Sequence, residues 1–174
     1  MAALEQEHEN ALQIVQKQIQ FARDYSSQLV GSVETADWFR IPTGSVSNIA
    51  WQVGHLAMAQ YGLTLLRIRG KEPSDAEFIT NAFMRCFKKG STPQEDPSAY
   101  PSCEEIQQVF DAVHERAMSE IAGYTFEQLS ESLPAPTAMY DTKLGSLFFC
   151  PMHEMLHAGQ IGTIRRGLGL KPIR

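Results

Sequence analysis

The histidines of this 174-residue chain carry its clearest chemical signal. His153 and His157 are four residues apart, so on a helix they share one face with their Cβ atoms about 5–6 Å apart. Two imidazoles at this spacing can bind one transition-metal ion, because the helical hydrogen bonds keep the backbone rigid. Together with Glu154 they form the H-E-x-x-H pattern of zinc peptidases.

A zinc peptidase nevertheless fits the rest of the chain poorly. These enzymes take a third metal ligand downstream of the second histidine, and residues 158–174 contain no His, Asp, Glu or Cys. Gln160 and Thr163 stand where the longer peptidase pattern requires Gly and His. No strand pattern is present that could hold an extended peptide. Peptidase activity therefore ranks last among the functions considered.

A third ligand must come from upstream, and His55 is the best candidate. It lies in residues 41–66, a segment without any charged side chain, and Gly54 beside it would allow a close approach. Three imidazoles from two helices would form a site with open positions for water or substrate. The alternative is that His55 is a hydrogen-bonded histidine of the core, and the spacing alone leaves both interpretations open.

Other polar residues have weaker claims on a functional role. His8 and His114 are expected at the rim or on the partly exposed surface. Glu154 is interpreted as a solvated carboxylate in preference to a partner of a ligand histidine, and it remains a weak catalytic candidate. Gln160, one turn beyond His157, is the other, because it could orient a bound group or a ligand imidazole.

The sulfur-containing residues indicate no chemistry of their own. Cys86, Cys103 and Cys150 are odd in number and form no C-x-x-C, so we expect free thiols and a reducing, cytoplasmic environment. Cys150 is expected to be buried. The methionines of the helical segments are expected to fill gaps in the core, and they are Met58, Met118, Met152 and Met155.

Composition excludes several classes of protein. The net charge of −5 argues against nucleic-acid binding, which needs clustered Lys and Arg. The uncharged residues 41–66 contain too many polar groups, such as Gln52, His55 and Gln60, to span a membrane. The acidic N-terminus does not resemble a targeting peptide. The length favours a single domain over residues 1–174.

Four helices must position the candidate site. Apolar residues recur at three- and four-residue steps in four segments, which are residues 4–29, 47–69, 102–121 and 144–166. Ser47 and Ser102 are the expected N-caps of the second and third helices. Pro151 lies inside the fourth segment, so that helix either kinks there or begins there.

Two connections separate these helices. Residues 71–101 are expected to hold a short helix that Ser74 and Glu77 cap and Gly90 ends. Residues 125–141 are expected to hold one short helical turn. Four helices joined by at least one long crossover predict an all-α protein with the architecture of a four-helix bundle.

Three strings together resemble the DinB superfamily, the DinB/YfiT group of metal-binding helical proteins. They are Ile49-Ala50-Trp51-Gln52-Val53-Gly54-His55-Leu56-Ala57, Tyr100-Pro101-Ser102, and His153-Glu154-Met155-Leu156-His157-Ala158-Gly159-Gln160-Ile161. Their order and their separation extend the resemblance over nearly the whole chain. The resemblance implies an antiparallel four-helix bundle in an up-down-down-up arrangement with long crossovers.

The resemblance also implies a cofactor and a range of functions. A divalent metal, nickel or zinc, would be held by His55, His153 and His157. Relatives include thiol-dependent S-transferases, a mycothiol-dependent maleylpyruvate isomerase and the N-terminal domain of the ergothioneine-forming sulfoxide synthase. Homodimers are common in the family. We therefore expect a homodimer that acts on a small molecule, with a low-molecular-weight thiol as cosubstrate.

Two hypotheses of different classes follow. The first is a metal-dependent enzyme that transfers a thiol or hydrolyses a small molecule. The second is a non-enzymatic, metal-stabilised helical bundle that acts through oligomerisation or partner binding. An open coordination position would favour the first, whereas a fourth protein ligand would favour the second.

Overall fold

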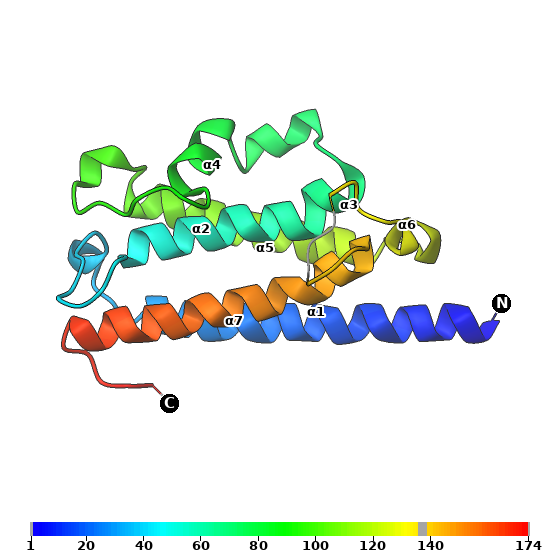
Figure 1. The fold of residues 1–174 in the computed structure, drawn as a ribbon, viewed down its shortest axis with the longest axis horizontal. Helices are drawn as coiled ribbons and strands as arrows, with labels where there is room; N and C mark the ends of the chain where they lie inside the picture. The colour runs from blue at the N-terminus through cyan, green and yellow to red at the C-terminus, as the bar shows by residue number, and fades with distance from the viewer. Residues whose placement is uncertain (1, 136–138, 174) are drawn as a thin grey trace.

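The computed structural model describes residues 2–135 and 139–173, and these residues form an all-helical fold (Figure 1). Within them, the one extended pairing is an isolated antiparallel bridge between Ser132 and Thr142. The predicted all-α class is therefore confirmed. No helix in the described part of the chain has the length and hydropathy needed to cross a membrane.

Four long helices lie side by side (Figure 1). They are α1 (Ala2–Val30), α2 (Ile49–Tyr61), α5 (Cys103–Ile121) and α7 (Lys143–Gly167). In Figure 1, α1 and α7 run in one direction and α2 and α5 in the other. The closest pairs are α1 with α7 and α2 with α5, while α7 also packs on α2. The contact between α2 and α7 is the one that brings the histidines together.

Shorter elements connect the long helices. They are η1 (Thr35–Asp37), η2 (Gly62–Leu66), α3 (Arg67–Arg69), η3 (Pro73–Glu77), α4 (Asn81–Phe87), η4 (Pro97–Ala99) and α6 (Phe126–Ser130). The first connection contains α4, which packs across α2, and the second contains α6. Both short helices expected in the connections are therefore present.

The helix starts differ from the predicted ones at two of three caps. Ser102 caps α5 as expected. The cap of α2 is Asn48 in place of Ser47, and its side-chain oxygen accepts a bond from a first-turn amide. The cap of α4 is Thr80 in place of Ser74. Ser74 lies instead in the separate element η3, so the helix of this connection begins later than expected.

The second helix continues beyond α2 through a wider turn, the π-helix η2 (Gly62–Leu66). Two side chains from other helices bind its carbonyls. The Tyr124 hydroxyl donates to the Thr64 carbonyl at 2.9 Å, and the Ser146 hydroxyl donates to the Leu63 carbonyl at 2.9 Å. These bonds connect the end of the second helix to the segment after α5 and to α7.

Pro151 neither starts nor ends a helix. α7 begins eight residues earlier at Lys143, behind the cap residue Thr142, and runs through the proline. Because proline has no backbone N–H, the bond that residue 151 would donate to the carbonyl of Leu147 is missing. Pro151 is itself buried, so packing against the core offsets the loss.

The core comprises two clusters. The larger lies around α2, α4, α5 and the end of α7, and it includes Val53, Leu56, Phe83, Phe87, Ile106, Phe110, Ile161 and Ile164. The smaller lies around α1, α6 and the start of α7, and it includes Leu12, Val15, Ile19, Leu129 and Leu147. Cys150 is buried there as expected. Met152 and Met155 are exposed, which corrects their expected place in the core.

Close packing at Gly54 fixes the distance between α2 and α4. A Cβ atom built on Gly54 would lie 2.5 Å from a ring carbon of Phe87, a distance that forces a shift. On α7, a Cβ atom built on Gly159 would meet no atom within 4 Å. The two glycines thus differ in their surroundings although both lie inside helices.

This contrast gives a paired test of stability. Gly54→Ala should lower the free energy of unfolding by about 1–3 kcal/mol, because the Phe87 ring must move out of a filled core. Gly159→Ala should raise it by about 0.5–1 kcal/mol, because alanine restricts the unfolded chain more than glycine. Urea unfolding followed by circular dichroism measures both. Equal stability of Gly54→Ala and the wild type would contradict the packing argument.

Candidate metal centre

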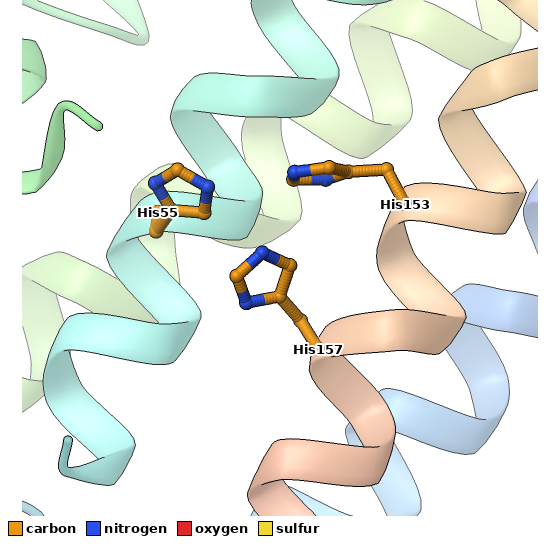
Figure 2. Close-up of side chains that lie close together, drawn as sticks. All are labelled: His55, His153 and His157. Carbon is orange, nitrogen blue, oxygen red and sulfur yellow. The ribbon is translucent and has the colours of Figure 1, made fainter. Parts of the chain in front are cut away.

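Three histidines from α2 and α7 point into one space between these helices (Figure 2). His55, His153 and His157 each offer one ring nitrogen, and these nitrogens lie within 4.8 Å of one another. His55 is buried, whereas the other two are partly exposed. The structure thus brings together all three residues of the predicted ligand set, on one face that solvent can reach.

The spacing of the three nitrogens fits a single transition-metal ion. In a triangle with sides of 4.8 Å, each corner lies about 2.8 Å from the centre, and zinc–imidazole bonds are about 2.0–2.1 Å long. Each nitrogen would therefore move inward by less than about 1 Å, which a small rotation of the side chain supplies. The donor set of three imidazoles suits zinc, nickel, copper or iron.

The His55 imidazole is held by a backbone carbonyl and by an aromatic ring. Its Nδ1–H donates to the Phe87 carbonyl at 2.8 Å, at the end of α4. That carbonyl has no partner within its own helix, so His55 satisfies it. The Trp51 indole stacks on the other side at a centroid distance of 4.7 Å. With Nδ1 protonated, Nε2 carries the lone pair that a metal requires.

The His157 imidazole is held by a side-chain amide. Its Nδ1–H donates to Oε1 of Gln52 at 2.6 Å, which again leaves Nε2 as the coordinating nitrogen. The Gln52 amide nitrogen donates to Oγ of Ser47 at 2.9 Å and to Oε1 of Gln160 at 3.0 Å. Gln52 is only 1% exposed, so its amide lies inside the protein, whereas Gln160 is exposed.

The His153 imidazole is positioned by rings alone. Its centroid lies 4.6 Å from that of His157, 5.4 Å from that of His55 and 5.8 Å from that of Phe149. Among residues 2–135 and 139–173, no hydrogen-bond partner of His153 is found. Neither ring nitrogen is held by a hydrogen bond from the described residues, so either can face an ion.

Burial keeps the three histidines neutral. Desolvation lowers the pKa of His153 to about 4, and repulsion from a protonated His55 contributes. Desolvation likewise lowers the pKa of His157 to about 3, helped by repulsion from the other two rings. The pKa of His55 is also lowered by burial, against the opposing effect of its bond to Phe87. Neutral imidazoles are the form that donates a lone pair to a metal.

Glu154 is not the solvated carboxylate that we expected from the sequence. It is 2% exposed and accepts from Nε of Arg23 on α1 at 3.0 Å. On a helix it projects about 100° away from His153, and here that direction leads to Arg23 on α1. A metallopeptidase needs this glutamate as a base beside the metal. The ion pair with Arg23 removes that role, so the peptidase interpretation fails on geometry.

Each guanidinium nitrogen of Arg23 has a partner in the interior. Besides Glu154, it donates to the Phe110 carbonyl and to Oε1 of Gln60, both at 2.6 Å. Its guanidinium also lies over the Phe110 ring, 3.4 Å from the centroid. The Gln60 amide in turn reaches Nδ1 of His114 at 3.1 Å. This network joins α1, α2, α5 and α7, and none of the three clustered histidines is among its bonded residues.

The remaining candidates lie outside the histidine cluster. Gln160 contacts Gln52 and not His157, so it is one bond removed from the ligand set. His8 is partly buried and bonds to the Tyr124 carbonyl at 3.0 Å. The partly buried His114 belongs to the Arg23 network. All three cysteines, Cys86, Cys103 and Cys150, are free as expected.

Gln52 is a site residue that the sequence patterns did not identify. It stands three residues before His55, hence on the same side of α2, inside the charge-free segment. A glutamine in such a segment needs a buried partner, which was a usable signal. The partner itself is 105 positions away in the chain, so no local pattern could identify it.

Comparison with known proteins supports the resemblance to the DinB superfamily. The sequence profile described as the DinB superfamily matches residues 18–161. Among solved structures, the chain is similar to a conserved protein from Enterococcus faecalis, with a TM-score of 0.69 and 15% identity over 90% of this chain and 96% of that one. At this identity, the similarity concerns the fold alone. A search of curated proteins finds no match.

The lowered pKa values predict how the stability of the metal-free protein depends on pH. Unfolded histidines have a pKa of roughly 6.5. Below that pH the unfolded state binds protons, whereas His153 in the folded site binds a proton only near its pKa of about 4. The free energy of unfolding should therefore fall as the pH drops from 6.5. Urea unfolding with a chelator at pH 7.5 and pH 5 measures the loss.

The matched control replaces His55, His153 and His157 by Gln. This variant keeps His8 and His114, so the difference between the two proteins isolates the cluster. The variant should lose less stability on acidification than the wild type does. Equal losses would show that the three imidazoles are not held neutral.

Proposed function

The chain belongs to the DinB superfamily, and on that premise we propose that it is a metal-dependent enzyme with the antiparallel four-helix bundle of that family. His55, His153 and His157 would hold a divalent ion, nickel or zinc. The reaction would be the transfer of a low-molecular-weight thiol, or the hydrolysis of a small molecule. The observation that carries the proposal is the convergence of three neutral imidazoles on one accessible point.

The number of ligands favours catalysis over a structural role. Within the described residues, three His, Cys, Asp or Glu side chains share the cluster, and a structural zinc site is normally closed by four. A three-ligand site keeps a position open for a substrate atom. His153 and His157 are partly exposed, which gives a small molecule access to that position.

The residues around the proposed metal have separate roles. Phe87 and Gln52 fix the rings of His55 and His157 through their carbonyl and amide oxygens. A divalent ion, when bound, stabilises a thiolate or a hydroxide at neutral pH, so no separate strong base is required. Trp51 and Phe149 border the histidines and offer apolar surface to a substrate.

Metal content of purified variants tests the ligand set. After dialysis, the wild type should retain metal in an equimolar amount. His153→Ala and His157→Ala should lose it, because the paired ligands of α7 are broken, and His55→Ala should bind more weakly. His8→Ala and His114→Ala are matched controls that should bind like the wild type. Full occupancy in His55→Ala would remove His55 from the site.

Thiol binding can be tested on the same proteins by spectroscopy. In the Co²⁺-loaded wild type, an added low-molecular-weight thiol should produce sulfur-to-metal charge-transfer absorption, whereas His157→Ala should show none. Absence of the band with every thiol tried, in a protein that does bind Co²⁺, would favour hydrolysis over thiol transfer.

A specific surface supports the expected homodimer, which is compatible with catalysis. A groove of about 520 Å³ runs between α1 and α7 and is lined by Lys17, Gln18, Phe21, Phe148, Pro151, Met152 and Met155. Ile14 and Leu156 add exposed apolar surface on the same two helices. We propose that a second copy of this chain covers this face, here called the α1/α7 face.

The area of the α1/α7 face suits a dimer. Five large apolar residues on it are 38–64% exposed, and they are Ile14, Phe21, Met152, Met155 and Leu156. Large side chains present on the order of 150–200 Å² each, so these five offer roughly 400–500 Å² of apolar surface. A standard interface buries about 800 Å² per partner, of which a little over half is apolar.

Charge placement on α1 also suits a two-fold pairing. Lys17 and Asp24 are both exposed and lie seven residues apart, on the same stripe of the helix as Phe21. If two copies of α1 pair in antiparallel fashion near Phe21, Lys17 of each copy lies beside the partner's Asp24. An isologous contact thus places opposite charges together twice.

Light scattering at tens of micromolar should give twice the monomer mass. Phe21→Glu should shift the protein toward the monomer, because a carboxylate would be buried in the apolar contact. The matched control is Val46→Glu, at a residue that is 88% exposed and lies before α2, and it should remain dimeric. A monomeric wild type would contradict the dimer without affecting the metal site.

A further inference from the structure

Gln52 adjoins the proposed metal site, and a role for it rests on that proposed function. Gln52 lies on α2, one turn before His55, and its side chain crosses to α7. It is the only described side chain that hydrogen-bonds the His157 ring. It also contacts Gln160, the residue one turn beyond His157.

The amide of Gln52 has all its hydrogen bonds satisfied within the protein. Its oxygen faces Nδ1 of His157 at 2.6 Å, and its nitrogen faces Oγ of Ser47 and Oε1 of Gln160. An amide buried to this extent cannot exchange these partners for water without a cost. The direction of the amide is therefore coupled to the position of the proton on His157.

The two directions of the amide have opposite consequences for metal binding. With its oxygen toward His157, the ring carries its proton on Nδ1, and Nε2 keeps a lone pair for the ion. With its nitrogen toward His157, Nδ1 must accept, the proton moves to Nε2, and that nitrogen cannot bind a metal. Ser47 can donate or accept, so it permits either direction.

We propose that Gln52 is a positioning residue that holds His157 in the tautomer with Nδ1 protonated, so that Nε2 binds the metal. Gln160 acts through Gln52, by accepting from its amide nitrogen and thereby keeping the amide oxygen toward His157. Gln160 thus has a role in orienting a ligand imidazole, but at one remove from it.

The neutral charge of Gln52 is part of the role. The partner of His55 is also neutral, a backbone carbonyl. The one carboxylate nearby in sequence, Glu154, is paired with Arg23 of α1. A bound divalent ion would therefore keep its full positive charge. A carboxylate in place of Gln52 would make His157 a stronger donor and would tighten metal binding.

Three variants in the full-length protein test the proposal, with Co²⁺ as the probe. Gln52→Leu keeps the bulk but removes the acceptor, so Co²⁺ should bind about 10–100-fold more weakly. Gln52→Glu keeps an acceptor and should bind at least as tightly as the wild type. Gln160→Leu leaves His157 and Gln52 in contact and should lose less affinity than Gln52→Leu. The visible spectrum of bound Co²⁺ should change in Gln52→Leu and persist in Gln52→Glu.

A second measurement uses the wild type, so its result does not depend on whether a variant folds. In the metal-free wild type, ¹⁵N chemical shifts of the histidine rings distinguish the two tautomers, and His157 should carry its proton on Nδ1. A proton on Nε2 would overturn the proposal. The proposal would also be overturned if Gln52→Leu bound Co²⁺ with the affinity and the spectrum of the wild type. A wild-type chain that binds no Co²⁺ would contradict the proposed function itself, whatever the tautomer.

Discussion

The buried ion pair between Arg23 and Glu154 is the constraint on which the site depends. It connects α1 to α7, and its remaining bonds reach Phe110 and Gln60 on α5 and α2. Removing one member would leave a charge without a partner in the interior, at a cost of about 3–5 kcal/mol. The pair therefore fixes the rotation of α7 about its axis. With Glu154 held by Arg23, His153 and His157 of the same helix meet His55 of α2.

This arrangement divides α7 into two polar environments. One side holds a charged pair whose carboxylate is neutralised by Arg23. The other holds uncharged imidazoles, with a backbone carbonyl and the Gln52 amide as their acceptors. Burial lowers the pKa of all three imidazoles and keeps them neutral, which is the state that binds metal.

The packing of α4 against α2 gives the site its second support. Phe87 uses its ring and its carbonyl for different purposes, since the ring fills the space beside Gly54 and the carbonyl accepts from His55. A side chain at position 54 would push away the same residue that orients the ligand ring. The requirement for glycine is thus one of close approach, and it links core packing to the geometry of the candidate ligand.

The sequence by itself determined the helices and the candidate ligands. Periodicity placed the four helical segments, and the spacing of His153 and His157 showed that they share a face. The cap of α2, the environment of Glu154 and the role of Gln52 were decided only by the tertiary structure. The physical reason is that helical faces follow from local repeats, whereas the partner of a buried polar group is set by helix packing. Arg23 and Gln52 meet their partners 131 and 105 positions away, contacts that no local pattern specifies.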